Sequence, residues 1–130
     1  MTVAYASTNE SHWDLGRLSY LKLQAHCEAR FHPVELLSEP THPESYDRPV
    51  WDDLVGRVKN DEITLLILPS LIHVAGKNIA QLSDFLALLE RHQVKLLTLK
   101  ERIDSDRLSR SQILMQFVNL SLSFNPNKGL

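Results

Sequence analysis

The stretch ITLLILP at residues 63–69 constrains the fold of this chain more than any other feature. It contains four consecutive apolar residues, 65–68, with no polar alternation, and a proline ends it. A strand with one solvated face alternates polar and apolar residues, whereas a strand of a parallel sheet is covered on both faces and is continuously apolar. The stretch therefore predicts a central strand whose sheet is covered by helices on both sides.

Expected strands and helices alternate along the rest of the chain. The other expected strands are 2–6, 33–37 and 95–99, and the expected helices are 14–30, 49–59, 79–89 and 109–124. This alternation predicts an α/β fold with three layers, a mostly parallel central sheet of about four strands and right-handed crossovers. We also expect a long C-terminal helix and a single domain over residues 1–130. Ligands of such sheets bind at the carboxyl ends of the strands.

Spacings of three and four residues indicate which side chains of a helix face the core. In the first helix these are Leu15, Leu18, Leu21 and Ala25. The final helix is apolar on more than one side, which is typical of a helix that also contacts a second chain. We therefore expect a homo-oligomer whose interface contains Ile113, Phe117, Val118 and Phe124.

Composition narrows the classes of function. The formal net charge of −2 argues against binding of nucleic acid by the whole surface, although a local basic face is compatible with it. Cys27 is the only cysteine, which excludes an internal disulfide and favours a reducing compartment. No leader-like segment begins the chain, and residues 65–68 are too few to span a membrane, so we expect a cytoplasmic protein without membrane contact.

The histidines and tryptophans give no sign of a bound group. The six histidines show no ligand-like spacing on one element, so neither a metal nor another cofactor is expected. His73 is expected to be a surface loop residue. Trp13 and Trp51 are expected to cover the edges of the core.

Three short motifs lie at the ends of expected strands or at the start of an expected helix. VAYAST at residues 3–8 ends the first strand, DRP at 47–49 begins the second helix, and ERIDS at 101–105 follows the last strand. In this order they resemble Tyr-x-Arg-Val-Ser-Thr, Asp-Arg-Pro and Glu-Gly-Ile-Asp-Thr of the catalytic domain of serine recombinases, the resolvase and invertase family. A looser match is IHVAGK at 72–77, which resembles Leu-Asp-Arg-Leu-Gly-Arg and keeps Gly76. The resemblance covers nearly all 130 residues and implies a resolvase-like fold.

The resemblance also implies a chemistry and the residues that perform it. Family members cut DNA by attack of a serine on a phosphodiester, which forms a 5′-phosphoserine bond. Ser7 falls on that nucleophile, and Arg48 falls on a catalytic arginine. Thr8, Lys77 and Arg102 are the candidates for contacts with phosphate or DNA.

Three family arginines are missing from these motifs. Tyr5 and Val74 stand at two of their positions, and Lys77 stands at a third. The planar fork of arginine binds two phosphate oxygens, whereas lysine supplies one point charge. One transition-state arginine contributes roughly 10³–10⁵ in rate to other phosphoryl-transfer enzymes, so catalysis is expected to be impaired. Asn125-Pro126 is also expected to end the final helix where family members continue towards DNA, so the resemblance implies a resolvase-like domain with no C-terminal DNA-binding domain.

Each candidate residue also has a structural interpretation. Ser7 can be a polar turn residue at the end of a strand, with Thr8 or Asn9 satisfying backbone groups of the loop. Arg48 can pair with Asp47 or a nearby glutamate. Lys77 can be a solvated loop lysine.

Three functions therefore remain open. The favoured one is a resolvase-like protein that is catalytically impaired and acts as an oligomerisation or regulatory module. The alternative is an active site-specific recombinase domain that forms a DNA intermediate through Ser7, with DNA as a partner that binds weakly to this chain alone. A nucleotide-binding α/β domain is a third hypothesis, but no Gly-rich fingerprint follows the first strand.

Overall fold

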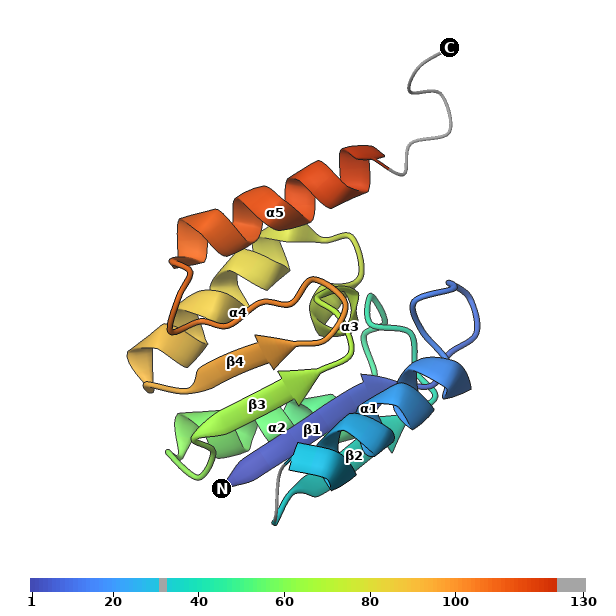
Figure 1. Ribbon diagram of the computed structural model, residues 1–130, viewed down its shortest axis with the longest axis horizontal. Helices are drawn as coiled ribbons and strands as arrows, with labels where there is room; N and C mark the ends of the chain where they lie inside the picture. Colours follow the sequence, from blue (N-terminus) through green and yellow to red (C-terminus); the bar gives the residue numbers. More distant parts are fainter. Residues whose placement is uncertain (31–32, 124–130) are drawn as a thin grey trace.

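The computed structural model describes residues 1–30 and 33–123, which form a four-stranded sheet with helices on both faces (Figure 1). The elements in chain order are β1 (Thr2–Ser7), α1 (Arg17–Arg30), β2 (Glu35–Glu39), α2 (Pro49–Lys59), β3 (Leu65–Leu68), α3 (Ile72–Ala75), α4 (Ile79–Arg91), β4 (Lys95–Thr98) and α5 (Arg110–Ser123). The predicted α/β class is confirmed.

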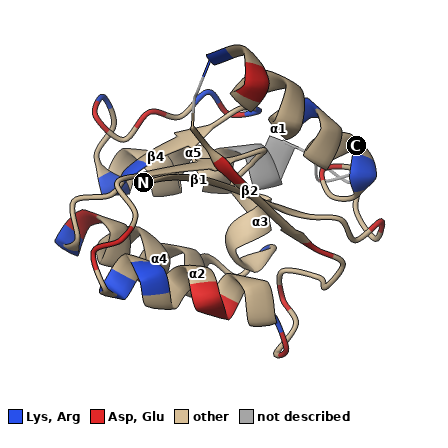
Figure 2. Ribbon diagram, turned by 90° about the horizontal axis from the view of Figure 1, so that it is seen from below, with Lys and Arg blue, Asp and Glu red and all other residues tan. Residues whose placement is uncertain are grey.

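The sheet has the strand order β2-β1-β3-β4, and each neighbouring pair is parallel. Helix α1 covers one face, and α2 and α4 cover the other, so the expected three layers are present (Figure 2). Strand β3 lies inside the sheet, as the apolar stretch predicted, and Leu66, Ile67 and Leu68 are fully buried. The carboxyl ends of the four strands lie at one edge of the molecule (Figure 1).

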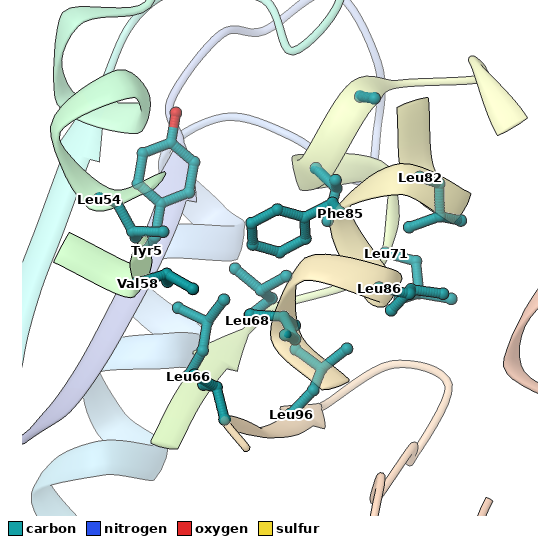
Figure 3. Packing of buried hydrophobic residues seen from close by; sticks show 14 of the residues in the cluster. Tyr5, Leu54, Val58, Leu66, Leu68, Leu71, Leu82, Phe85, Leu86 and Leu96 are labelled. Atoms are coloured by element: carbon teal, nitrogen blue, oxygen red, sulfur yellow. The ribbon is translucent and has the colours of Figure 1, made fainter. Parts of the chain in front are cut away.

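The alternation of β1 side chains divides the core between the two faces of the sheet. Val3 and Tyr5 face the larger cluster, which α2 and α4 complete (Figure 3). Ala4 and Ala6 face α1, where they pack with Leu23 and other buried residues. Because alanine side chains are short, α1 lies close to the strand and contacts it directly.

The inward face predicted for the first helix is wrong. Leu18 and Leu21 are 62% and 46% exposed, whereas Leu23 and Cys27 are buried. The prediction counted the spacing from Leu15, but α1 begins at Arg17, and Leu15 is buried in the preceding loop. The phase of the apolar stripe is therefore set by Leu23 and Cys27, which are one turn apart.

Two further segments differ from the sequence expectation. Strand β2 begins two residues later than predicted and continues to Glu39, because Glu39 pairs with Ser7 at the end of β1. The short helix α3 was not predicted. It ends at Ala75 and is followed by Gly76, whose φ of 58° favours glycine. A Cβ atom at Gly76 would lie only 2.5 Å from Cγ of Glu44.

The final helix occupies the expected place in the chain but packs differently from the expectation. Helix α5 has 14 residues, the same number as α1, so a long C-terminal helix is not shown. It packs against α4, beyond the β4 edge of the sheet (Figure 1). Ile113 and Phe117 are 3% and 8% exposed and belong to the core of this chain. Val118 is partly exposed, and Phe124 lies outside the described residues.

Candidate functional site

Ser7 lies at the carboxyl end of β1, and its side chain is turned into the protein. The residue is fully buried. Its hydroxyl donates a hydrogen bond of 2.9 Å to the carbonyl oxygen of Thr41, in the loop between β2 and α2. The same hydroxyl oxygen accepts from the backbone N–H of Asn9 at 3.3 Å. The loop before α2 therefore lies directly against Ser7.

His73 lies on α3, after β3, and is not the surface residue that the sequence suggested. It is fully buried, and its Nδ1 accepts a hydrogen bond of 2.9 Å from the backbone N–H of Ser7. Its Nε2 lies 2.9 Å from the carbonyl oxygen of Asp14, which can only accept. These two partners require the neutral ring with the proton on Nε2. Burial, with the nearby Arg48 charge as a smaller contribution, lowers the pKa of His73 to about 4.

Arg48 immediately precedes α2, and its guanidinium group is directed inward. The residue is 4% exposed. Nη1 donates to the carbonyl oxygens of Pro43 and Val74, and Nη2 donates to the carbonyl oxygen of His73 at 2.8 Å. The guanidinium carbon also lies 4.5 Å from the centre of the Trp51 ring. Arg48 therefore joins the loop before α2 to α3, rather than forming an ion pair with Asp47.

Tyr5 and Glu39 complete the buried polar group. The hydroxyl of Tyr5 donates to Oε1 of Glu39 at 2.5 Å and accepts from Nη2 of Arg48 at 3.3 Å. Figure 3 shows this hydroxyl pointing away from Leu66 and Leu68. Burial and the bond to Glu39 raise the pKa of Tyr5, so the phenol is neutral at physiological pH. Its hydroxyl links the carboxylate to the guanidinium.

Glu39 also binds the start of α2. Its carboxylate oxygens accept from the backbone N–H groups of Val50 and Trp51 at 3.0 and 2.9 Å. These groups have no partner within the helix, and the positive end of the helix dipole favours a carboxylate there. The buried charge of Glu39 is thereby satisfied at three points. We call Tyr5, Ser7, Glu39, Arg48 and His73 the buried polar group.

The remaining predicted site residues lie around this group. The backbone N–H of Thr8 donates to the carbonyl oxygen of Glu39 at 2.9 Å. Lys77 is exposed just after α3. Arg102 is also exposed and has a φ of 56°, the left-handed conformation that a glycine takes readily. The structure thus brings Ser7 and Arg48 into one hydrogen-bonded network and leaves Lys77 and Arg102 on the surface.

The hydrogen bonds that the buried polar group already makes determine which chemistry it can perform. The hydroxyl proton of Ser7 faces a carbonyl oxygen, which is not a base that could remove it. The ring nitrogen of His73 near Ser7 accepts the backbone N–H and not the hydroxyl. Both Nη atoms of Arg48 are bonded to protein oxygens. In this arrangement the residues hold loops together at the carboxyl edge of the sheet.

Sequence reasoning missed His73 and Glu39 as members of the group. Glu39 stood in the long loop expected before Asp47, and one acidic residue beside a proline gives no sign of burial. The only available signal for His73 was its position four residues after the proline that ends the central strand, where a parallel sheet gathers its functional side chains. Among the described residues, no group of three His, Cys, Asp or Glu side chains is placed to hold a metal ion.

The described residues contain no helix that is both long and apolar enough to cross a membrane.

No protein-family model matches the chain, and no curated protein matches it. Solved structures do match. The N-terminal catalytic domain of TP901-1 integrase has a TM-score of 0.66 and 12% sequence identity, with 94% of each chain covered.

A resolvase family site-specific recombinase from Streptococcus pneumoniae gives a similar result. The TM-score is 0.56 at 17% sequence identity, with 95% of this chain and 89% of that chain covered. Both matches extend over nearly the whole chain. The chain therefore has the resolvase-like fold of these two proteins.

Proposed function

We propose that this chain is a member of the serine recombinase family that has kept the fold but not the strand-cleaving activity, and that it acts as an interaction module. The supporting observation is the inward bonding of Ser7. A nucleophile must present its oxygen to the phosphorus, but this hydroxyl is buried and bonded to the carbonyl of Thr41. The loop before α2 would have to move before DNA could approach it.

The cations of the site support the same proposal. Phosphoryl transfer needs donors aimed at the phosphate oxygens. Arg48 directs its guanidinium to backbone carbonyls and is 4% exposed. Tyr5 and Val74, which stand where the family has arginines, are buried and uncharged. Of the predicted site residues, Lys77 and Arg102 are the exposed cations that remain to supply charge to a phosphate at this edge.

The balance of surface charge favours weak DNA binding by this chain alone. Helix α2 carries an acidic residue in its first turn and basic residues in its last turn, so the face that α2 and α4 form shows both signs of charge (Figure 2). Affinity for DNA rises with the number of phosphates that cations neutralise together. We therefore propose that the surface of α5 binds a partner protein rather than DNA.

The outer side of α5 is the proposed interaction surface, and we place its centre at Met115 and Val118. These side chains are 63% and 38% exposed and lie three residues apart, so they share a face of the helix. Ile113 and Phe117 hold α5 on its own chain instead. Self-association through this outer side would bury the two exposed apolar side chains.

The first test is strand cleavage. Purified protein is incubated with supercoiled and nicked DNA, denatured, and run on a gel beside a competent serine recombinase. We expect a covalent adduct only with the competent enzyme. An adduct with this protein that is absent from Ser7→Ala would overturn the proposal and make Ser7 a working nucleophile.

The second test is self-association, measured by light scattering over a range of concentrations. We expect an oligomer that dissociates in the Met115→Glu and Val118→Glu variants. Gln116→Glu is the matched control, because this exposed residue lies about 100° around the helix from Met115. A monomer at every concentration, or equal dissociation in the control, would contradict the proposed interface.

A further inference from the structure

The two faces of the sheet are covered unequally. The chain crosses from β1 to β2 in one direction, and from β2 to β3 and then from β3 to β4 in the opposite direction. Because such crossovers are right-handed, the connections in the two directions lie on opposite faces of the sheet. Helix α5 follows β4 and packs against α4. Over residues 1–30 and 33–123, α1 is therefore the one helix on its face, opposite α2 and α4 (Figure 2).

The part of this face that α1 leaves open has the width of one helix. Neighbouring strands lie about 4.8 Å apart, and an α-helix with its side chains is about 10 Å wide, so one helix covers about two strands. Helix α1 packs on β1 and lies over β1 and β2 (Figure 1). Strands β3 and β4 lie on the other side of β1. A second helix would fit over them, beside α1.

The side chains of β3 and β4 on this face are apolar and incompletely covered. On β4, Leu96 faces the larger core cluster and is 1% exposed. Its neighbour Leu97 faces the α1 side and is only partly buried. Leu65 on β3 and Leu99 just after β4 are on the same side and are also partly buried. In a parallel sheet, helices normally cover residues of this kind on both faces.

A hollow of about 330 Å³ lies where α1 meets the end of β4. Leu18 and Lys22 line it from α1, and Leu99 lines it from the sheet. Leu18 is 62% exposed, so it lies at the open rim of the hollow. We call Leu18, Lys22, Leu65, Leu97 and Leu99 the α1 trough. Its lining is mainly leucine, which suits the apolar side of an amphipathic helix.

The charge of the trough favours a partner with acidic residues. Lys95 and Lys100, on and just after β4, form ion pairs with Asp106 and Asp14. Lys22 is exposed, and within the described part of the chain its ammonium group has no acidic partner. A carboxylate at the edge of a bound helix could pair with it, whereas a basic helix would be repelled.

Packing and charge argue against the other described helices as the occupant. Helices α2 and α4 pack their apolar sides in the core of their own chain. The outer side of α5 is apolar at Met115 and Val118, but α5 contains no aspartate or glutamate that could pair with Lys22 of a second copy. A helix of another protein is therefore the better fit.

We propose that the α1 trough binds an amphipathic helix of a partner protein. The apolar side of this helix covers Leu97 and Leu99, and an acidic residue beside that side pairs with Lys22. The bound helix lies next to α1 and completes the layer that α1 leaves half open. The trough is separate from the outer side of α5, so this inference goes beyond self-association and does not depend on it.

Two stapled helical peptides of matched sequence test the proposal. Both carry leucine at every third or fourth position, with glutamates beside the leucines in one peptide and lysines in the other. The staple keeps both helical, because short peptides are marginally helical in water. Each is titrated into ¹⁵N-labelled protein, and the amides of Lys22, Leu97 and Leu99 are followed by NMR. We expect saturable shifts with the glutamate peptide and roughly tenfold weaker binding of the lysine peptide.

Three results of these titrations would overturn the proposal. The first is the absence of saturable shifts at the trough with the glutamate peptide. The second is equal affinity of the two peptides. The third is a shift of the same amides by anionic lipid vesicles or duplex DNA but not by the glutamate peptide, which would assign the trough to another class of partner.

The Lys22→Glu variant tests the ion pair. We expect it to weaken binding of the glutamate peptide roughly three- to tenfold and to strengthen binding of the lysine peptide. Arg17→Glu is the matched control, because it makes the same charge change about 140° around α1 from Lys22. This control should alter the affinities less. Equal changes in the two variants would indicate attraction by net charge alone and would overturn the proposal.

The Leu18→Glu variant tests the apolar contact without disturbing the core. Leu18 is largely exposed and glutamate is a good helix former, so this variant is expected to fold. A carboxylate at the rim of the trough should abolish saturable binding of the glutamate peptide. Met115→Glu on α5 is the control, and it should leave the affinity unchanged. Unchanged binding in Leu18→Glu, or a loss in Met115→Glu, would place the peptide elsewhere and overturn the proposed surface.

Discussion

At the scale of single residues, the buried polar group shows how functional residue types can serve structure. Arg48 and His73 each contact two or more loops, and both are almost completely buried. In the sequence, Ser7 and Arg48 fall on catalytic positions of the family that the chain resembles. Their hydrogen-bond partners, which the sequence does not show, are mainly backbone groups.

The neutral state of His73 makes stability depend on pH. Its pKa is lowered to about 4 in the folded chain from 6.5 in an unfolded one. Between these two values the unfolded chain binds more protons, so the free energy of unfolding should fall as the pH falls from about 6.5 to 4. With each pKa unit equal to about 1.4 kcal/mol, this contribution is about 3 kcal/mol.

The measurement is urea denaturation at pH 7 and pH 4.5, compared with a His73→Asn variant that cannot take up this proton. We expect wild type to lose more stability than the variant over this interval. His42→Asn removes a half-buried loop histidine and should retain the wild-type dependence. An equal loss in wild type and His73→Asn would refute the assigned role of His73.

Arg48 should be required for stability, and lysine should not replace it. A lysine cannot reproduce the fork that donates to several carbonyls, so Arg48→Lys is expected to lower the free energy of unfolding by at least about 2 kcal/mol. The control is Arg57→Lys, where the ion pair with Glu35 is at the surface and the change should be below about 1 kcal/mol. Unchanged stability of Arg48→Lys in urea denaturation would show that the guanidinium is free for other partners.

At the scale of elements, the side chains of a helix that face the core can be predicted only if the first residue of the helix is known. The proline at 49 and an apolar stripe of Val50, Leu54, Val55 and Val58 predicted α2. Leu54 and Val58 are buried as expected, whereas Val50 and Val55 are only partly buried and Trp51 takes their place in the core. The same reasoning failed for the first helix, because Leu15 is buried but belongs to the loop before it. A periodic pattern alone cannot distinguish a residue inside the helix from a buried residue just before it.

Substitutions in helix α5 test which side of this helix packs in the core. Phe117 is packed in the core, so Phe117→Ala should cost about 3 kcal/mol or more of unfolding free energy. Val118→Ala removes a partly exposed side chain one position away and should cost less than about 1 kcal/mol in the monomer. Thermal and urea unfolding at low concentration measure both. A larger cost at Val118 than at Phe117 would mean that α5 is rotated about its axis.

At the scale of the whole molecule, the fold could be predicted because its signals are local. The apolar stretch at β3 and the alternation of strands with helices were enough for the parallel sheet and its layers. The environment of Ser7 could not be predicted, because Thr41 and His73 are separated from it by 34 and 66 residues. Such contacts depend on how loops close over the end of the sheet, and no periodic pattern encodes loop closure.

The most direct measurement of the central claim is the unfolding free energy of Ser7→Ala. If the hydroxyl of Ser7 is structural, its removal leaves the carbonyl of Thr41 and the N–H of Asn9 without that partner and should cost roughly 1–3 kcal/mol. Ser111→Ala, at an exposed helix position, should change stability by less than about 0.5 kcal/mol. Active sites are commonly held at some expense of stability, so a free nucleophile predicts the opposite. A loss in Ser7→Ala alone supports our account, and an unchanged or increased stability of this variant would contradict it.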